Sequence, residues 1–94
     1  MKEVNLKKDD FWYDDKIVSS LGMENEKHIR FTAVDKKYDL EVITPDKSTS
    51  RFPVPDDGTY HKYEIKGSKN QTYTFKMILN EPPVTVPQMI VTID

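Results

Sequence analysis

The sequence predicts a mostly β protein, a small antiparallel β-sandwich or barrel of about six strands with a short N-terminal helix. Valine, isoleucine and threonine contribute 8, 7 and 8 residues, against 4 leucines and 1 alanine. β-branched side chains lose rotamer freedom in helices and pack well on pleated sheets. Several segments also alternate apolar and polar residues between turn-forming residues, which is typical of strands.

Two alternating segments in the middle of the chain predict a pair of strands. Ile29, Phe31 and Ala33 share one face of "HIRFTAV", residues 28–34, and "YDLEVIT", residues 38–44, follows after "DKK". Because three residues suffice for a tight connection, we expect a β-hairpin here. "RFPVP", residues 51–55, contains Pro53 and therefore predicts a short edge strand.

Three further features complete the strand pattern. "PDDG", residues 55–58, predicts a turn that returns into "TYHKYEIK". "QTYTFKMIL", residues 71–79, alternates most cleanly, and "QMIVTID" forms the last strand after Pro82, Pro83 and Pro87 break the ladder. The predicted core comprises Ile29, Phe31, Leu40, Val42, Phe52, Val54, Ile65, Tyr73, Phe75, Met77 and Val91.

The stretch "DDFWYDD", residues 9–15, places three aromatic residues between two aspartate pairs. Read as a helix, Asp10 is a suitable N-cap and Gly22 suits the position after the C-cap. Apolar residues between them then fall on one arc, with Trp12 outside it. We therefore favour a short helix that covers the sheet. Trp12 is expected to pack in the core rather than to form an exposed ligand platform.

The length and net charge of the chain indicate its number of domains and the kinds of partner it attracts. The chain has 94 residues, which indicates one domain over residues 1–94, alone or as one module of a longer protein. Its net charge of −2 gives no long-range attraction to nucleic acid, and no apolar run is long enough for a membrane span. Met1 as the natural start favours a cytoplasmic or virion location. Met1 as the start of a trimmed precursor favours an extracellular one.

No pattern of catalytic or metal-binding residues is present in the sequence. His28 and His61 lack a metal-ligand spacing, and the aspartate pairs lack the alternation of a calcium loop. The serines have no nucleophile motif, and the glycines are too scattered to cradle a phosphate. We therefore expect no catalytic residue, no metal and no cofactor. A small enzyme with a paired-carboxylate site is the third-ranked function.

Four residues are candidates for ligand binding: Trp12, Tyr13, Tyr60 and Lys62. Aromatic residues are enriched where partner proteins bind, so a protein is the first expected partner. Tyr60 and Lys62, with Lys66, Lys69 and Lys76, could instead form the strip by which an OB-like barrel binds single-stranded nucleic acid. The negative net charge disfavours that alternative. The oligomeric state is left open.

The pattern of the central strands resembles that of accessory β-sandwich domains of secreted bacterial proteins. A strand containing Asp39, Leu40, Val42 and Pro45 is followed by "GTYHKYEI", residues 58–65, and then by a further strand. The resemblance covers about half of the chain, and turn and alternation rules shared by many sandwiches produce it. It carries no binding motif over to this chain. The lack of catalytic patterns, together with the loops and edges that a sandwich exposes, predicts an immunoglobulin-like, non-catalytic binding module on a bacterial cell surface or in a phage-like assembly.

Overall fold

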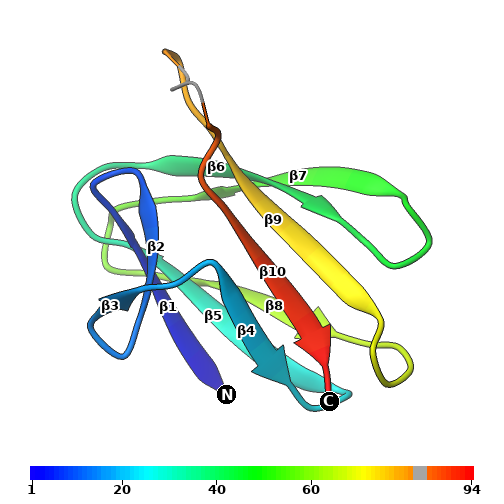
Figure 1. Cartoon of the computed structure of the whole chain (residues 1–94). Coiled ribbons are helices and arrows are strands. Elements are labelled where there is room, and N and C mark those ends of the chain that lie inside the picture. The colour runs from blue at the N-terminus through cyan, green and yellow to red at the C-terminus, as the bar shows by residue number, and fades with distance from the viewer. Residues whose placement is uncertain (82–84) are drawn as a thin grey trace.

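A computed structural model describes residues 1–81 and 85–94, which form strands joined by short loops (Figure 1). These residues contain no helix that could cross a membrane. The strands are β1 (Lys2–Lys7), β2 (Asp10–Tyr13), β3 (Lys16–Ile17), β4 (Ser20–Met23), β5 (Lys27–Ala33), β6 (Tyr38–Ile43), β7 (Thr49–Val54), β8 (His61–Ile65), β9 (Thr72–Ile78) and β10 (Gln88–Ile93).

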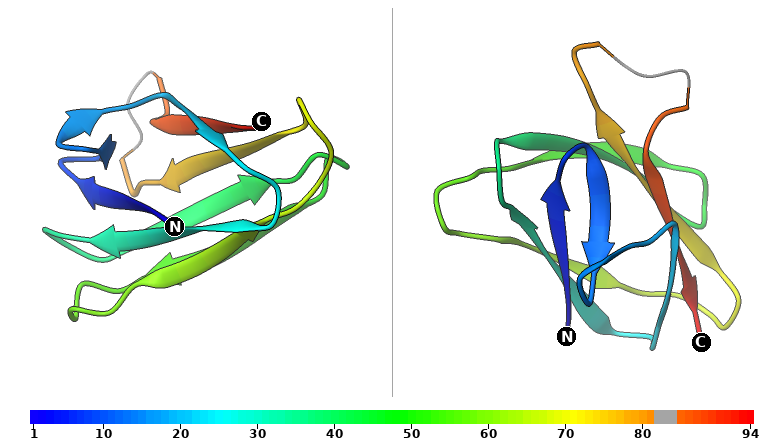
Figure 2. Two further views of the ribbon diagram at one scale, coloured as in Figure 1. Left: turned by 90° about the horizontal axis from the view of Figure 1, so that it is seen from below. Right: turned by 60° about the vertical axis from the view of Figure 1, so that its left-hand side comes forward.

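The strands form two five-stranded sheets, in the orders β3-β2-β1-β5-β8 (sheet I) and β4-β10-β9-β6-β7 (sheet II). The sheets face each other, as in a sandwich (Figure 2). Buried apolar side chains fill the space between them. The mostly β prediction is thus confirmed, but the estimate of about six strands was too low. Most strand pairings are antiparallel, as expected, but β1 pairs with β5, and β4 with β10, in parallel.

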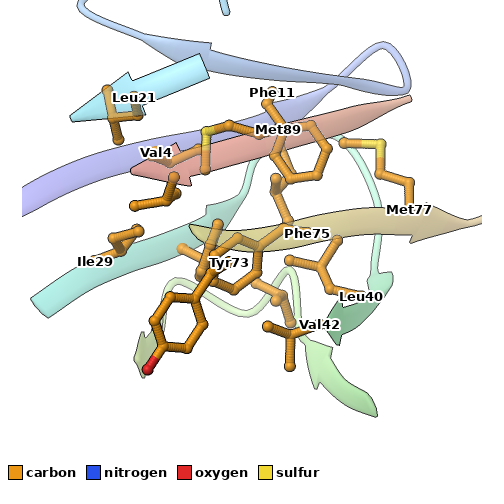
Figure 3. Packing of buried hydrophobic residues seen from close by; sticks show 14 of the residues in the cluster. Val4, Phe11, Leu21, Ile29, Leu40, Val42, Tyr73, Phe75, Met77 and Met89 are labelled. Carbon is orange, nitrogen blue, oxygen red and sulfur yellow. The ribbon is translucent and has the colours of Figure 1, made fainter. Parts of the chain in front are cut away.

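The core lies between the two sheets and is built from the inward residues of nearly every strand (Figure 3). Phe31 and Phe75 meet at its centre, with their ring centroids 5.0 Å apart. The predicted core residues are buried, with the exception of Phe52, which is half-buried and packs against the core from the edge strand β7. Val4 and Leu6 of β1 are also fully buried, and the alternation in "KEVNLK" was the sequence signal for them.

The predicted N-terminal helix is wrong, because residues 10–23 form β2, β3 and β4. Two-residue turns precede and follow β2, with positive φ at Lys8 and Asp9 (52° and 58°) and at Asp14 and Asp15 (53° and 61°). Positive φ at both central residues is the geometry of the type I′ hairpin turn, which aspartate tolerates. Asp9, Asp14 and Asp15 are therefore turn residues, and Asp10, the predicted helix N-cap, is the first residue of β2.

The predicted hairpin over residues 28–44 is also wrong, although both of its strands exist. β5 belongs to sheet I and β6 to sheet II, so the link between them crosses from one sheet to the other. Both strands place their apolar face toward the same inter-sheet core, which satisfies the alternation without pairing the two strands. Local alternation determines which face is buried. It does not determine which strand lies alongside.

The edge position predicted for the strand with Pro53 is confirmed, because β7 is the last strand of sheet II. Pro53 lies opposite Asp39 of β6, on the outer face of that sheet. β8 is the corresponding last strand of sheet I, and side chains of the two edge strands meet across the sandwich. Pro82 and Pro83, predicted to break the ladder, lie outside the described residues.

Candidate functional site

The outer face of sheet I gathers most of the residues predicted to bind a ligand. Trp12 of β2 lies opposite Asn5 of β1, which lies opposite Thr32 of β5. In the next row, Arg30 of β5 stands between Glu3 of β1 and Lys62 of β8. Residues that are distant in the sequence are therefore neighbours on one sheet surface.

Tyr60, Arg30 and Glu3 form a chain of contacts across this face. The Arg30 guanidinium lies 4.2 Å from the centroid of the Tyr60 ring, and its Nη1 donates to Glu3 Oε1 over 2.8 Å. Tyr60 is 47% exposed. A guanidinium stacked on a tyrosine ring and bonded to a carboxylate keeps few rotamers, so the exposed phenol is held in one place.

Trp12 is half-buried on the outer face and does not belong to the core, in contrast to the expectation from the sequence. Its indole Nε1 donates to the carbonyl of Lys7 over 3.1 Å, and Lys7 Nζ lies 4.4 Å from the ring centroid. These contacts fix the indole against β1. Alternation explains the position, because Phe11 on the same short strand takes the inward place and is 1% exposed.

An open groove of about 670 Å³ lies next to this pair of aromatic residues. Tyr13, the remaining predicted binding residue, lines it, and Lys2 Nζ lies 5.3 Å from the Tyr13 ring centroid. The groove is lined by Met1, Lys2, Glu3, Asn5, Tyr13, Asp14, Asp15 and Arg30. Its wall is mostly polar, whereas sites for small cofactors are mostly apolar. The groove therefore differs in chemistry from a typical small-cofactor site.

The basic strip postulated for nucleic acid is divided between the two sheets. Tyr60 and Lys62 face outward from sheet I, whereas Lys76 lies on the outer face of sheet II, opposite Glu41 and Gln88. The strip is therefore not continuous. Tyr60 and Lys62 remain neighbours beside Arg30, which gives three groups suited to a nucleic-acid strand on one face.

The two histidines lie on opposite faces of sheet I. His28 is on the outer face, where its Nε2 is 3.9 Å from Glu64 Oε2. His61 turns inward and stacks on Phe52. Across residues 1–81 and 85–94, no group of three histidine, aspartate or glutamate side chains is arranged to hold a metal ion.

A polar network that the sequence did not predict joins the β1–β2 turn to the β5–β6 link. The Lys8 amide and the Tyr38 hydroxyl both donate to the Asp35 carboxylate over 2.8 Å, and Lys36 Nζ lies 2.7 Å from Asp9 Oδ1. Burial, reinforced by Asp35, raises the pKa of Tyr38 to about 12. Partial desolvation works against ionisation of Asp35, but these two hydrogen bonds outweigh it and lower its pKa. The network ties one end of the sandwich together.

Arg30 and Glu3 were the functional candidates that sequence reasoning missed. Arg30 was assigned to the polar face of its strand, and Glu3 lay in a segment for which no strand was expected. The alternation of "KEVNLK" was the available signal, because it places Glu3 on the outer face once Val4 and Leu6 are inside.

Comparison with known proteins identified no relative of this chain. The chain matches no family model, no curated protein and no solved structure.

Proposed function

We propose that the protein is a non-catalytic interaction module that binds a partner protein through the outer face of sheet I. One observation carries the proposal: Trp12, Tyr60 and Arg30 lie on this face beside the groove that contains Tyr13. Tryptophan, tyrosine and arginine are the residue types that dominate binding energy in protein interfaces. The outward residues of the sheet II strands include neither tryptophan nor tyrosine.

The aromatic residues are held in position before any partner arrives. Lys7 covers the Trp12 ring and Arg30 covers the Tyr60 ring. Side chains that are already ordered lose less entropy on binding, so each contact contributes more to affinity. This preorganisation favours recognition over a role as passive surface.

The groove indicates the chemistry of the partner. In the groove, Arg30 pairs with Glu3, and Lys2 Nζ donates to the Gly22 carbonyl over 2.7 Å. Asp14 and Asp15 are the carboxylates of that wall without an ion pair to another described residue. A partner segment with lysine or arginine would complement them, and that attraction would weaken with salt. We therefore infer a partner with a basic protrusion.

The strand order supports an immunoglobulin-like sandwich as the scaffold. In immunoglobulin domains one sheet has the order G-F-C-C′, and the other contains strands B and E side by side. Here β10-β9-β6-β7 corresponds to the first order, and β5 and β8 to the second pair. Sandwiches of this class carry many binding functions, so the assignment supports the module and does not identify the partner.

A bacterial cell surface or a phage-like assembly is the proposed setting of the module. Fractionation of the native host, followed by an antibody against this domain, tests the location. Recovery of the intact gene product with surface or virion fractions is the expected result. Its confinement to the soluble cytosol would reject this setting without affecting the binding surface.

The experiment on binding compares variants on the two sheets. Wild-type protein, Tyr60→Ala and Trp12→Ala are immobilised, partners are captured from host extract, and the recovered protein is purified and titrated directly. Ile90→Ala is the matched control, because Ile90 is 36% exposed on the outer face of sheet II. We expect both sheet I variants to lose affinity by tenfold or more, about 1.4 kcal/mol, and the control to bind as wild type.

Equal binding by all the variants would reject the sheet I face. A second candidate, binding of single-stranded nucleic acid, is favoured specifically by the cluster of Tyr60, Arg30 and Lys62. Titration with a single-stranded oligonucleotide at low salt separates it from protein binding. Affinity that falls steeply with salt and is lost in Lys62→Ala would favour nucleic acid. No binding at low salt would dismiss it.

A further inference from the structure

Along one edge of β8, the backbone groups have no strand beside them among residues 1–81 and 85–94. β8 is the last strand of sheet I after β5, and it is labelled in Figure 1. Glu26 N donates to Ile65 O over 2.8 Å, so the backbone of Ile65 points to the β5 side. These groups alternate along a strand, so Lys62 and Glu64 direct their N–H and C=O groups away from β5.

One end of this edge is closed within the chain. The Tyr73 hydroxyl accepts from the Lys66 amide over 3.1 Å and donates to the Lys66 carbonyl over 2.6 Å. After Glu64, Lys66 is the next residue whose backbone N–H and C=O point away from β5. The Tyr73 hydroxyl bonds both of these groups. The open part of the edge is therefore centred on Tyr63, between Lys62 and Glu64.

The charged side chains at this open edge of β8 are complementary to those of a second, antiparallel copy of the same strand. Lys62 lies opposite Arg30 in β5 and forms no ion pair with another described residue. Glu64 is two residues further along the same face, where its exposed carboxylate lies 3.5 Å from Lys66 Nζ and 3.9 Å from His28 Nε2. An antiparallel copy of the strand, centred on Tyr63, would place Glu64 of that copy opposite Lys62, and Lys62 of that copy opposite Glu64. Opposite charges directly across an antiparallel pair are stabilising.

We propose that β8 pairs antiparallel with β8 of a second copy of this chain and joins the two copies of sheet I into one continuous sheet. The two pairs between Lys62 and Glu64 would each exchange both backbone hydrogen bonds, because these residues face the partner strand. Addition of a strand to a free edge is a common mode of recognition, and a two-fold axis through Tyr63 closes the assembly at a dimer.

The other sheet edges are less suited to this pairing. β7 carries Pro53, which cannot donate a hydrogen bond, and β3 has only two residues. β4, "SLGM", has no charges to select a register. β8 has no proline and carries a self-complementary pair of charges.

The β8 interface is small, so we expect a weak dimer that gains strength where copies are crowded together. The inference is independent of the proposed binding face.

A series of charge-swap variants, measured by sedimentation over a range of protein concentrations, tests whether two copies pair through β8. The wild type should show an average mass that rises toward the dimer with concentration. Lys62→Glu and Glu64→Lys each place like charges opposite one another in both pairs, and each should weaken association by about tenfold or more. The double variant Lys62→Glu with Glu64→Lys reverses the pairs and should restore it. Lys76→Glu on sheet II is the control and should associate as wild type.

Two backbone readouts supplement the series. Exchange of the Lys62 and Glu64 amide hydrogens should slow as concentration rises, whereas that of Ile65, which faces β5, should not. Lys62→Pro removes an outward N–H and should give a folded monomer, since proline is tolerated where the N–H faces solvent. A wild type that stays monomeric at about millimolar concentration would overturn the proposal, as would a dimer unaffected by Lys62→Glu.

Discussion

The imidazole of His61 lies flat on the ring of Phe52, with ring centroids 4.1 Å apart and an angle of 14° between the planes. His61 belongs to β8 and Phe52 to β7, so the stack closes the seam where the edge strands of the two sheets meet. Tyr63 extends the layer, with its ring centroid 5.7 Å from that of Phe52. Burial in this stack lowers the pKa of His61, because the charged imidazolium would lose hydration.

This stack predicts a loss of stability in mild acid. The pKa of His61 is lower in the folded protein than the ordinary value of 6.5, so below that value the unfolded chain binds more protons. The free energy of unfolding should therefore fall as the pH decreases from about 7 to 5, and His61→Phe should reduce this dependence. Urea titrations across that range measure it. The same slope in both proteins would show that His61 is not responsible.

The raised pKa of Tyr38 predicts that the folded protein also loses stability at alkaline pH. Its pKa is about 12 in the folded protein against an ordinary 10.0, so its contribution is complete below about pH 10 and is lost as the pH rises toward 12. Tyr38 is 2% exposed, and two pKa units correspond to a loss of up to about 3 kcal/mol.

The variant Tyr38→Phe checks this alkaline loss. It should be less stable at neutral pH by about 1 kcal/mol, because it cannot donate to Asp35. It should also lose less stability between about pH 9 and 11.5 than the wild type. Tyr63, whose pKa is also raised by burial, is retained in both proteins and accounts for any residual slope. Denaturant titrations at several pH values provide the measurement, and parallel curves would contradict the prediction.

The turn between β2 and β3 predicts a stabilising substitution. Asp14 and Asp15 both have positive φ, and Asn-Gly is the preferred pair for such a turn. Asp14→Asn with Asp15→Gly should therefore raise the free energy of unfolding by about 1 kcal/mol. In a helix the added glycine would lower stability by a similar amount, so the sign distinguishes the two structures.

The preceding turn is a matched control for that experiment. Lys8→Asn with Asp9→Gly relieves the same backbone conformation but removes the contact of Asp9 with Lys36. The gain there should be smaller. Thermal denaturation of both pairs, compared with the wild type, measures the difference, and an equal gain would mean that the contact to Lys36 contributes little.

Trp12→Ala should destabilise the protein by an intermediate amount, about 2 kcal/mol. A fully buried tryptophan would cost about 3–5 kcal/mol, and a freely exposed one close to nothing. The half-buried indole loses part of its packing, its hydrogen bond to Lys7 and its cation–π contact. Trp12→Phe should recover about half of the loss. A cost above about 4 kcal/mol would place the ring in the core instead.

The candidate site was only partly predictable from the sequence. Trp12, Tyr13, Tyr60 and Lys62 were selected as residue types suited to binding. Trp12, Tyr13 and Lys62 belong to strands of sheet I, and Tyr60 immediately precedes β8 of that sheet. The contribution of Arg30 was not visible, because it depends on a stacking partner 30 residues away. Lys76 was grouped with Tyr60 because alternation assigns an outward face without saying to which sheet it belongs.

The sequence by itself determined the β class, the burial of the alternating residues and the edge position of the strand with Pro53. Each of these depends on local physics: rotamer preferences, the two-residue period of a strand and the missing amide of proline. Tertiary structure decided which strands pair, because β5 and β6 bury the same kind of face whether they share a sheet or oppose each other. Tertiary structure also decided whether "DDFWYDD" forms a helix or strands, because aspartate suits both a helix cap and a tight turn. Packing of Phe11 in the core favours the strand.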